Sequence, residues 1–198
     1  MSNRNLQDLV TIIVPYYKKI NFIDDCINSI LSQTFQNFEI ILIYDDNELD
    51  ELNYIKDLAN KDSRINLIIN KKKLGAGLSR NIGIEFGKGS LIAFLDADDL
   101  WKKNKLELQV QFMKKNNYFL SHTSYEIIDK NGLVTGHRKA RDFNNVNDLL
   151  KSCDIGLSTV MLSRHILDQN TKFPNLKTKE DFVLWLKLLE NKIFIASL

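Results

Sequence analysis

Apolar and polar positions alternate along the first half of the chain in blocks that predict strands separated by helices. Short apolar runs, each closed by polar or turn-forming residues, predict buried strands at Val10–Val14, Glu39–Tyr44, Ile65–Ile69 and Leu91–Leu95. Between these runs, apolar residues at helical spacing predict amphipathic helices around Ile23–Leu31, Leu49–Asn60 and Gly77–Phe86. Strands that alternate with helices favour a mostly parallel central sheet with helices on both faces.

The second half of the chain has a less regular pattern, which predicts a small antiparallel addition to this α/β fold. Strand-like stretches at Tyr118–Ile128 and Leu133–Gly136, joined by a turn, suit an antiparallel pair. Further short elements are expected at Val146–Ser152 (helix), Thr159–Leu162 (strand) and Arg164–Gln169 (helix). The last helix begins at Glu180, where the apolar residues again follow helical spacing.

The ends of the predicted parallel strands carry most of the polar chemistry. In such sheets, ligands bind at the carboxyl ends of the strands. That rule brings four segments to one crevice: Pro15 to Tyr17, Asp45 with Asp46, the Lys71 to Lys73 turn, and Asp96 to Asp99. The lysine turn is expected to be mainly a solvated surface, from which one ammonium group can reach a phosphate.

The apolar run Leu91–Leu95 ends in a cluster of carboxylates at Asp96, Asp98 and Asp99. Clustered carboxylates repel one another, and a hard divalent cation offsets that repulsion through oxygen ligands. An alternative is that Asp98 or Asp99 caps a following helix. A cap accounts for one aspartate and leaves Asp96 unexplained, so the pattern favours a metal or ligand site.

Composition narrows the function further. The chain has 198 residues, of which 44% are hydrophobic and 26% charged, with a formal net charge of +2. This balance suits one globular domain and disfavours nucleic acid as a partner. Only two cysteines occur, and neither metal-ligand spacing nor a disulfide framework is present. Without a signal peptide or a membrane-length apolar stretch, the expected location is cytoplasmic.

Several motifs, taken in order, resemble family 2 glycosyltransferases. They are Thr11 to Val14 followed by Pro15, Tyr16 and Tyr17; Ser29 to Phe35; the acidic pair after Tyr44; Gly77 to Asn81; Phe94 to Trp101; and Glu180 with Asp181 before Trp185. The resemblance covers nearly the whole chain. An isolated Asp-x-Asp would be weak, whereas this ordered set is specific.

The resemblance implies a GT-A fold and inverting transfer of a sugar from a nucleotide diphosphate donor, with UDP expected. It also implies a divalent cation, Mn²⁺ or Mg²⁺, which neutralises the leaving diphosphate. The residues that it assigns to the metal are Asp98, as the direct ligand, and Asp96. Those that it assigns to the donor nucleotide are Pro15, Tyr17, Asp46, Arg80, Asp96 and Ala97. Catalysis falls to Asp181 as the base, with Glu180 beside it.

The same resemblance implies that residues up to about 100 bind the nucleotide and that about 101–198 form the acceptor side. The expected acceptor is a glycan or lipid-linked hydroxyl in surface polysaccharide synthesis, which is compatible with a peripheral position at the inner face of the membrane. Family members often continue beyond the equivalent of Leu198, so we expect the chain to be truncated. Two alternatives stay open: an inactive nucleotide- or glycan-binding module, and a flavodoxin-like, Mg²⁺-dependent signalling domain.

Overall fold

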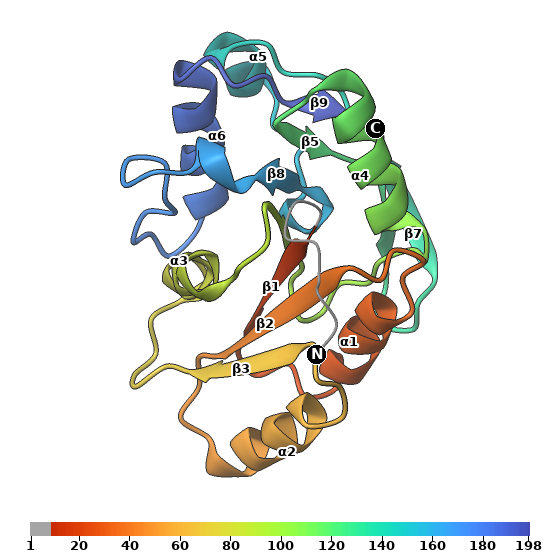
Figure 1. The fold of residues 1–198 in the computed structure, drawn as a ribbon, viewed down its shortest axis with the longest axis vertical. Helices are drawn as coiled ribbons and strands as arrows, with labels where there is room; N and C mark the ends of the chain where they lie inside the picture. The colour runs from red at the N-terminus through yellow and green to blue at the C-terminus, as the bar shows by residue number, and fades with distance from the viewer. Residues whose placement is uncertain (1–8) are drawn as a thin grey trace.

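The computed structural model describes residues 9–198, and its centre is a seven-stranded sheet in the order β3-β2-β1-β4-β8-β5-β9 (Figure 1). The parallel part consists of β1 (Val10–Tyr16), β2 (Phe38–Tyr44), β3 (Ile65–Ile69) and β4 (Leu91–Phe94). The sheet is completed by β5 (Leu120–His122), β8 (Met161–Ser163) and β9 (Ala196–Ser197), with β8 antiparallel to both of its neighbours. This confirms the predicted α/β fold class.

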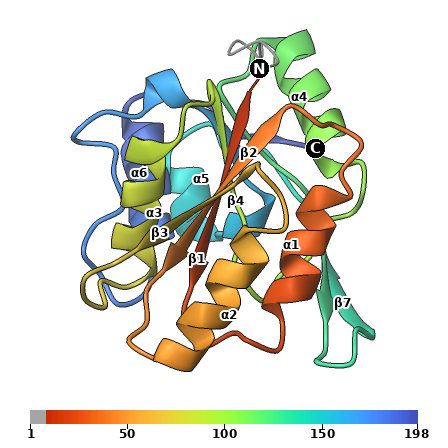
Figure 2. The ribbon, with the colours of Figure 1, turned by 60° about the horizontal axis from the view of Figure 1, so that its bottom comes forward.

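Helices cover both faces of the sheet, as the views in Figures 1 and 2 show. One face packs on α1 (Ile23–Leu31), α2 (Leu49–Ala59) and α4 (Lys105–Asn116). The other face packs on α3 (Ala76–Phe86), α5 (Val146–Lys151) and α6 (Glu180–Glu190). Successive strand residues point to opposite faces, so Ile12 joins the first core and Ile13 the second.

Helix α3 lies unusually close to the sheet because Gly83 has no side chain. A Cβ at that position would come within 2.6 Å of Cγ2 of Ile13. The close approach fixes the height of α3 above β1, and it therefore fixes where Arg80, one helical turn earlier, reaches the strand ends.

The sequence patterns were less accurate after residue 116. The expected strand Tyr118–Ile128 is split into β5 and β6 (Tyr125–Ile128), which belong to different sheets. Strand β6 pairs only with β7 (Val134–Arg138), giving a separate antiparallel hairpin. The expected helix Arg164–Gln169 is a single 3₁₀ turn at Arg164–Ile166, and β9 was not predicted.

The suggestion that Asp98 or Asp99 caps a helix is wrong. Helix α4 begins only at Lys105, and Asn104 occupies the N-cap position. The segment from Asp96 to Asn104 is a loop, within which the Asp99 amide donates to the Asp96 carbonyl at 2.9 Å. The carboxylates of Asp98 and Asp99 are therefore not used as helix caps and are available for other contacts.

Among residues 9–198, no helix is long and apolar enough to cross a bilayer. Cys26 is fully buried, and its thiol lies 3.5 Å from the Asp96 carbonyl oxygen. Burial raises the pKa of this thiol, which is consistent with a structural group rather than a reactive one.

Candidate functional site

The carboxyl ends of β1, β2 and β3 are held together by backbone bonds that continue past the strands. The Asp45 amide donates to the Tyr16 carbonyl at 2.9 Å, and the Asn70 amide donates to the Tyr44 carbonyl at 3.0 Å. The rings of Tyr16 and Tyr44 stack with their centroids 5.5 Å apart. This rigid edge places the polar segments beside one another, as parallel strands require.

Asp45 is buried and shapes the loop after β3. Its two carboxylate oxygens accept the backbone amides of Leu74 and Gly75, both at 2.7 Å, and the side-chain amide of Asn70 at 2.8 Å. Gly75 has a φ of +90°, a conformation that most residues avoid. Asp45 therefore orients the turn from which α3 starts, and its carboxylate is already fully engaged.

Asp46 has a different environment from its neighbour. Its Oδ1 accepts the Asn47 amide at 2.7 Å, whereas its Oδ2 is buried and accepts no bond from any described residue. A buried carboxylate oxygen without a donor is costly, so it marks a place where a ligand N–H fits. Burial together with the charge of Asp46 raises the pKa of nearby Tyr44 to about 12.

Pro15 and Tyr17 flank this position at the end of β1. Pro15 is half-buried, and Tyr17 is exposed. The ammonium of Lys73 lies over the Tyr17 ring, 3.5 Å from its centroid. The lysine turn is thus solvated, as expected, and it also covers the aromatic face expected to contact a nucleobase.

The loop after β4 is anchored through Ser158, in the 3₁₀ turn Leu157–Thr159. The Asp96 amide donates to the Ser158 hydroxyl at 3.1 Å, and this hydroxyl donates to Asp99 Oδ2 at 2.5 Å. The indole of Trp101 donates to the Ser158 carbonyl at 2.7 Å. Asp99 therefore has a structural contact, and burial raises the pKa of its carboxyl. Ala97, between the two motif aspartates, is buried.

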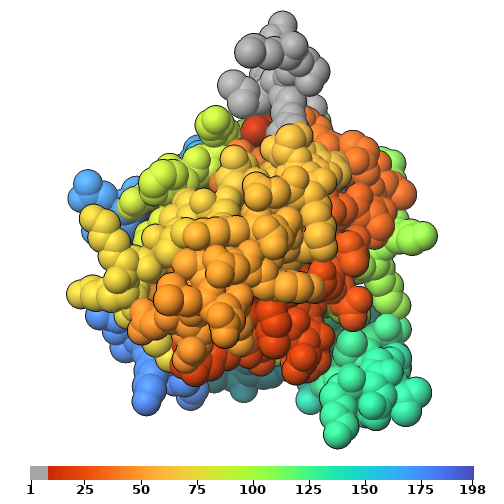
Figure 3. All heavy atoms as spheres, turned by 90° about the horizontal axis from the view of Figure 1, so that it is seen from below, coloured from red at the N-terminus to blue at the C-terminus, as the bar shows by residue number. Residues whose placement is uncertain are grey.

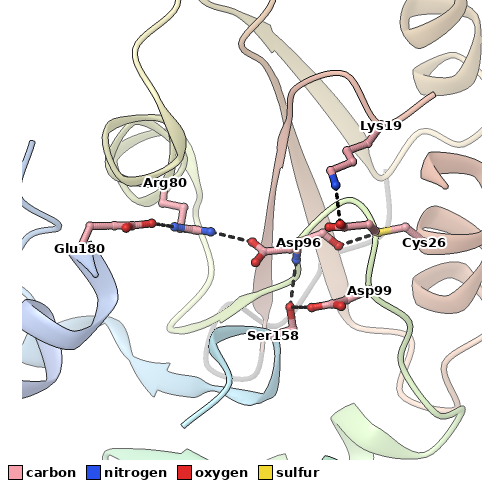
Figure 4. A network of polar contacts seen from close by, with 8 residues as sticks. Lys19, Cys26, Arg80, Asp96, Asp99, Ser158 and Glu180 are labelled. Atoms are coloured by element: carbon pink, nitrogen blue, oxygen red, sulfur yellow. Dashed lines mark hydrogen bonds and ion pairs between the residues drawn. The ribbon is translucent and has the colours of Figure 1, made fainter. Parts of the chain in front are cut away.

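Arg80 joins the end of β4 to the start of α6 (Figure 4). One guanidinium nitrogen donates to Asp96 Oδ1 at 2.6 Å, and the other donates to Glu180 Oε1 at 2.7 Å. The Arg80 side chain is only 4% exposed, and it lies over the ring of Phe173 at 5.5 Å. Its guanidinium thus spans two of the predicted site residues.

Glu180 also packs tightly against α3. A Cβ on Gly77 would lie 2.9 Å from the Glu180 Cγ, so only glycine leaves room for this contact. Asp181 follows it in the first turn of α6, half-buried, with Oδ1 accepting the Phe182 amide at 2.8 Å. Burial raises the pKa of Asp181, and the charge of Glu180 adds to the effect.

Asp98 lies on the solvent side of the same loop, where it pairs with Lys19 at 2.6 Å. Within residues 9–198, no group of three or more His, Cys, Asp or Glu side chains has the arrangement of a metal site made of protein ligands alone. Asp96 and Asp98 each keep one carboxylate oxygen that no described residue engages. These free oxygens fit a hard divalent cation whose remaining ligands come from a substrate or water.

Sequence reasoning missed Ser158 and Lys19. Ser158 lies about sixty positions from the loop that it anchors, and nothing in its local pattern separates it from an ordinary loop serine. His122 lies in β5 of the central sheet. It is fully buried, and its Nε2 bonds to the Arg141 carbonyl at 2.8 Å, so it belongs to the core.

The match to known proteins is consistent with this geometry. Residues 11–178 match the family model Glycosyl transferase family 2, and the chain belongs to this family. It is 42% identical over 183 residues to the Escherichia coli glucosyltransferase WfgD, covering 92% of this chain and 70% of that protein. It is 37% identical to an uncharacterized glycosyltransferase of Rickettsia felis, covering 95% of this chain but only 31% of that longer protein.

Solved structures show the same fold at lower sequence identity. Staphylococcus aureus TarS 1–349 in complex with UDP superposes with a TM-score of 0.79 at 21% identity, over 96% of this chain and 57% of that one. A mannosyltransferase from Pyrobaculum calidifontis, in complex with GDP-Man and Mn²⁺, gives a TM-score of 0.74 at 14% identity, over 98% and 56% of the two chains. The fold is therefore of the GT-A type, and the flavodoxin-like alternative is not retained.

Proposed function

We propose that this chain is the catalytic region of an inverting glycosyltransferase that moves a sugar from a UDP-sugar to a lipid-linked glycan hydroxyl in surface polysaccharide synthesis. The names of two Escherichia coli relatives, WfgD and WfaP, describe glucosyl transfer from UDP-Glc to a GlcNAc-diphosphoundecaprenol. Residues up to about 100 bind the donor, and about 101–198 form the acceptor side. A peripheral position at the cytoplasmic face of the membrane suits such an acceptor.

The observation that carries the proposal is the Arg80 bridge. It brings Asp96, expected at the donor nucleotide and the metal, next to the helix turn that contains Glu180 and Asp181. Donor and acceptor chemistry must meet at one anomeric carbon, so residues for both roles are expected side by side. In this arrangement Arg80 positions carboxylates on both sides and contacts the diphosphate only through its remaining edge.

The nucleotide is recognised at the ends of β1 and β2. The uncompensated Oδ2 of Asp46 accepts the imide N–H of uracil, and Tyr17 stacks on the base beside Pro15. In this structure the Lys73 ammonium covers one face of the Tyr17 ring. A nucleobase that stacks on this face displaces the ammonium toward the phosphates. Asp96 and the backbone at Ala97 contact the ribose and the diphosphate.

Asp98, with Asp96 beside it, would hold a Mn²⁺ or Mg²⁺ ion that supplies Lewis-acid neutralisation of the leaving diphosphate. Asp181 accepts the acceptor hydroxyl proton as the acceptor oxygen bonds to the anomeric carbon and the bond to the phosphate oxygen breaks. Its raised pKa makes it a better proton acceptor than an ordinary aspartate. Glu180 is bonded to Arg80, so its carboxylate serves to orient this turn.

Calorimetry with UDP, with and without Mn²⁺, tests the donor site. We expect binding that strengthens with the metal in the wild type. Asp98→Asn removes the metal dependence, whereas the exposed Asp57→Asn on α2 leaves it unchanged. Failure to bind UDP under any of these conditions excludes the proposed donor.

A panel of UDP-sugars then tests for an enzyme. Slow hydrolysis of one donor without an acceptor, or transfer to a lipid-linked acceptor, supports a transferase. Tight UDP binding with no turnover of any donor indicates the alternative, an inactive nucleotide-binding module.

A further inference from the structure

A cavity with several charged side chains in its lining lies outside the donor site, between the β6–β7 hairpin and the start of the segment that leads into α4. Its volume is about 350 Å³, and Lys102, Tyr125, Glu126, Arg138 and Lys139 line it. The hairpin carries Tyr125, Glu126 and Arg138, and it projects from the body of the molecule in Figures 2 and 3. None of them belongs to the donor site described above.

The cavity has an excess of positive charge. Lys102 pairs with Glu126, the acidic residue of the lining, at 2.9 Å. Arg138 makes only a long 3.3 Å bond to the neighbouring His137 carbonyl, and Lys139 is exposed. Neither pairs with a carboxylate within residues 9–198. A guanidinium and an ammonium without an acidic partner, side by side, suit the oxygens of a phosphate or diphosphate.

Beside the polar turn of the same hairpin, Asp129 to Gly132, the chain carries exposed aliphatic side chains. Leu133 is 66% exposed and Val134 is 50% exposed, and Ile127 and Ile128 are exposed beside them. Exposed aliphatic residues gathered on two short paired strands mark a contact surface for an apolar partner. The hairpin therefore presents cations at its base and exposed hydrocarbon next to its polar turn, a distribution that matches an anionic head with an apolar tail.

The cavity is also connected to the loop that carries the motif aspartates. Lys102 follows Trp101, whose indole is bonded to the Ser158 carbonyl. On the other side, the Tyr125 ring lies 3.3 Å from where a Gly156 Cβ would be, just before the 3₁₀ turn that contains Ser158. A ligand in this cavity is thus held against the acceptor side of the transfer site.

We infer that this cavity binds the diphosphate of a polyprenyl-diphosphate-linked acceptor, with Arg138 and Lys139 on the phosphates and the exposed aliphatic side chains beside the hairpin turn along the first prenyl units. The inference rests on the proposed function and names the part of the acceptor that this chain recognises besides its sugar. It adds a binding site that is distinct from the donor diphosphate position at Asp96 and Asp98.

The test uses geranyl diphosphate as the probe, titrated by calorimetry into protein saturated with UDP and excess Mg²⁺, so that the donor site is filled. We expect geranyl diphosphate to bind and geraniol, which lacks the diphosphate, not to bind. Arg138→Gln and Lys139→Gln each weaken binding by about threefold to tenfold. The matched control is Lys56→Gln, an exposed lysine on α2 beside the opposite edge strand, and it has no effect.

Any one of three results overturns the inference. Geranyl diphosphate binds both hairpin variants as tightly as the wild type, or inorganic diphosphate binds the wild type as tightly as geranyl diphosphate does. In the third result, the variants change only the sedimentation of the protein with phosphatidylglycerol vesicles. The last result identifies a general membrane contact. Absence of UDP binding in the first step refutes the proposed function separately, so the two failures are distinguishable. Both substituted residues are exposed, and unchanged urea unfolding verifies that the variants are folded.

Discussion

The Arg80 bridge gives a quantitative prediction for stability. Arg80 is almost fully buried and forms two charge-assisted bonds, of 2.6 and 2.7 Å, to Asp96 and Glu180. The Glu180 side chain is 14% exposed, so removing its cation leaves a poorly solvated carboxylate. Breaking a buried pair in this way costs about 3–5 kcal/mol. The Asp96 side chain is 38% exposed, and solvent screening makes its share the smaller one.

A double-mutant cycle isolates the interaction. Arg80→Gln alone is expected to lower the free energy of unfolding by about 3 kcal/mol, and Glu180→Gln alone by about 2 kcal/mol. In the double variant the orphaned charge is absent, so the loss falls short of the sum by about 2 kcal/mol. Arg80 also loses its contact with the Phe173 ring, but that loss occurs with and without Glu180 and cancels in the cycle.

The measurement is urea unfolding followed by the fluorescence of the two tryptophans, with the slope checked for constancy. A matched control is the exposed pair of Lys172 and Glu85, also 2.7 Å apart, whose side chains are 38% and 58% exposed. Its coupling energy should stay below about 1 kcal/mol. If the coupling between Arg80 and Glu180 is no larger than this control, the bridge does not hold the site together.

Other residues give further expectations. Asp181→Asn should abolish transfer and retain UDP binding, and wild-type turnover in this variant would show that Asp181 is not the base. Because burial raises the pKa of Asp181, kcat/KM of the wild type should begin to fall on acidification at a pH above the range in which an ordinary aspartate titrates. Burial lowers the pKa of Lys105 to about 7, so the unfolded chain binds more protons between about pH 7 and pH 10.5 and stability should rise with pH there. Lys105→Met should remove this dependence of stability on pH. It should also raise the free energy of unfolding at pH 7 by about 2 kcal/mol, after allowance for the lost contact with the Trp101 ring at 4.0 Å. If the variant keeps the dependence on pH, Lys105 is not its cause. Lys19→Met should raise the Mn²⁺ affinity by about twofold to fivefold, because Lys19 competes for Asp98; a weaker affinity argues for a different ligand.

The first half of the fold, up to about residue 100, could be predicted from sequence because its signals are local. Each of its strands is a short apolar run closed by a polar residue, and the carboxyl-end rule then needs only the strand order to place Asp46 and Asp96 on one edge. Even there, the adjacent aspartates 45 and 46 look equivalent in the sequence. Their different environments depend on Leu74 and Gly75, which approach Asp45 from a loop about thirty positions away.

The second half of the fold was less predictable because its strands are short and pair over long separations. Strand β9 has two residues and forms only because β5 offers it an edge. The split between β5 and β6 occurs where the chain leaves one sheet for another, and no change of residue pattern marks that point. The contact between Ser158 and Asp99 likewise follows from the packing of the 3₁₀ turn against the loop after β4.

The contacts of Glu180 indicate that the position of the candidate base depends on α3 and on the loop after β4. Helix α6 starts abruptly at Lys179, whose φ of 62° is left-handed, so the preceding chain does not by itself align the helix. Its first turn is aligned instead by Arg80, which is anchored on Asp96, and by the close contact with Gly77 of α3. Because α3 is in turn held on β1 through Gly83, a continuous series of contacts links β1 to the helix turn that contains Asp181. Substitutions that loosen Arg80 or Gly77 should therefore impair attack by the acceptor even where they leave the nucleotide contacts intact.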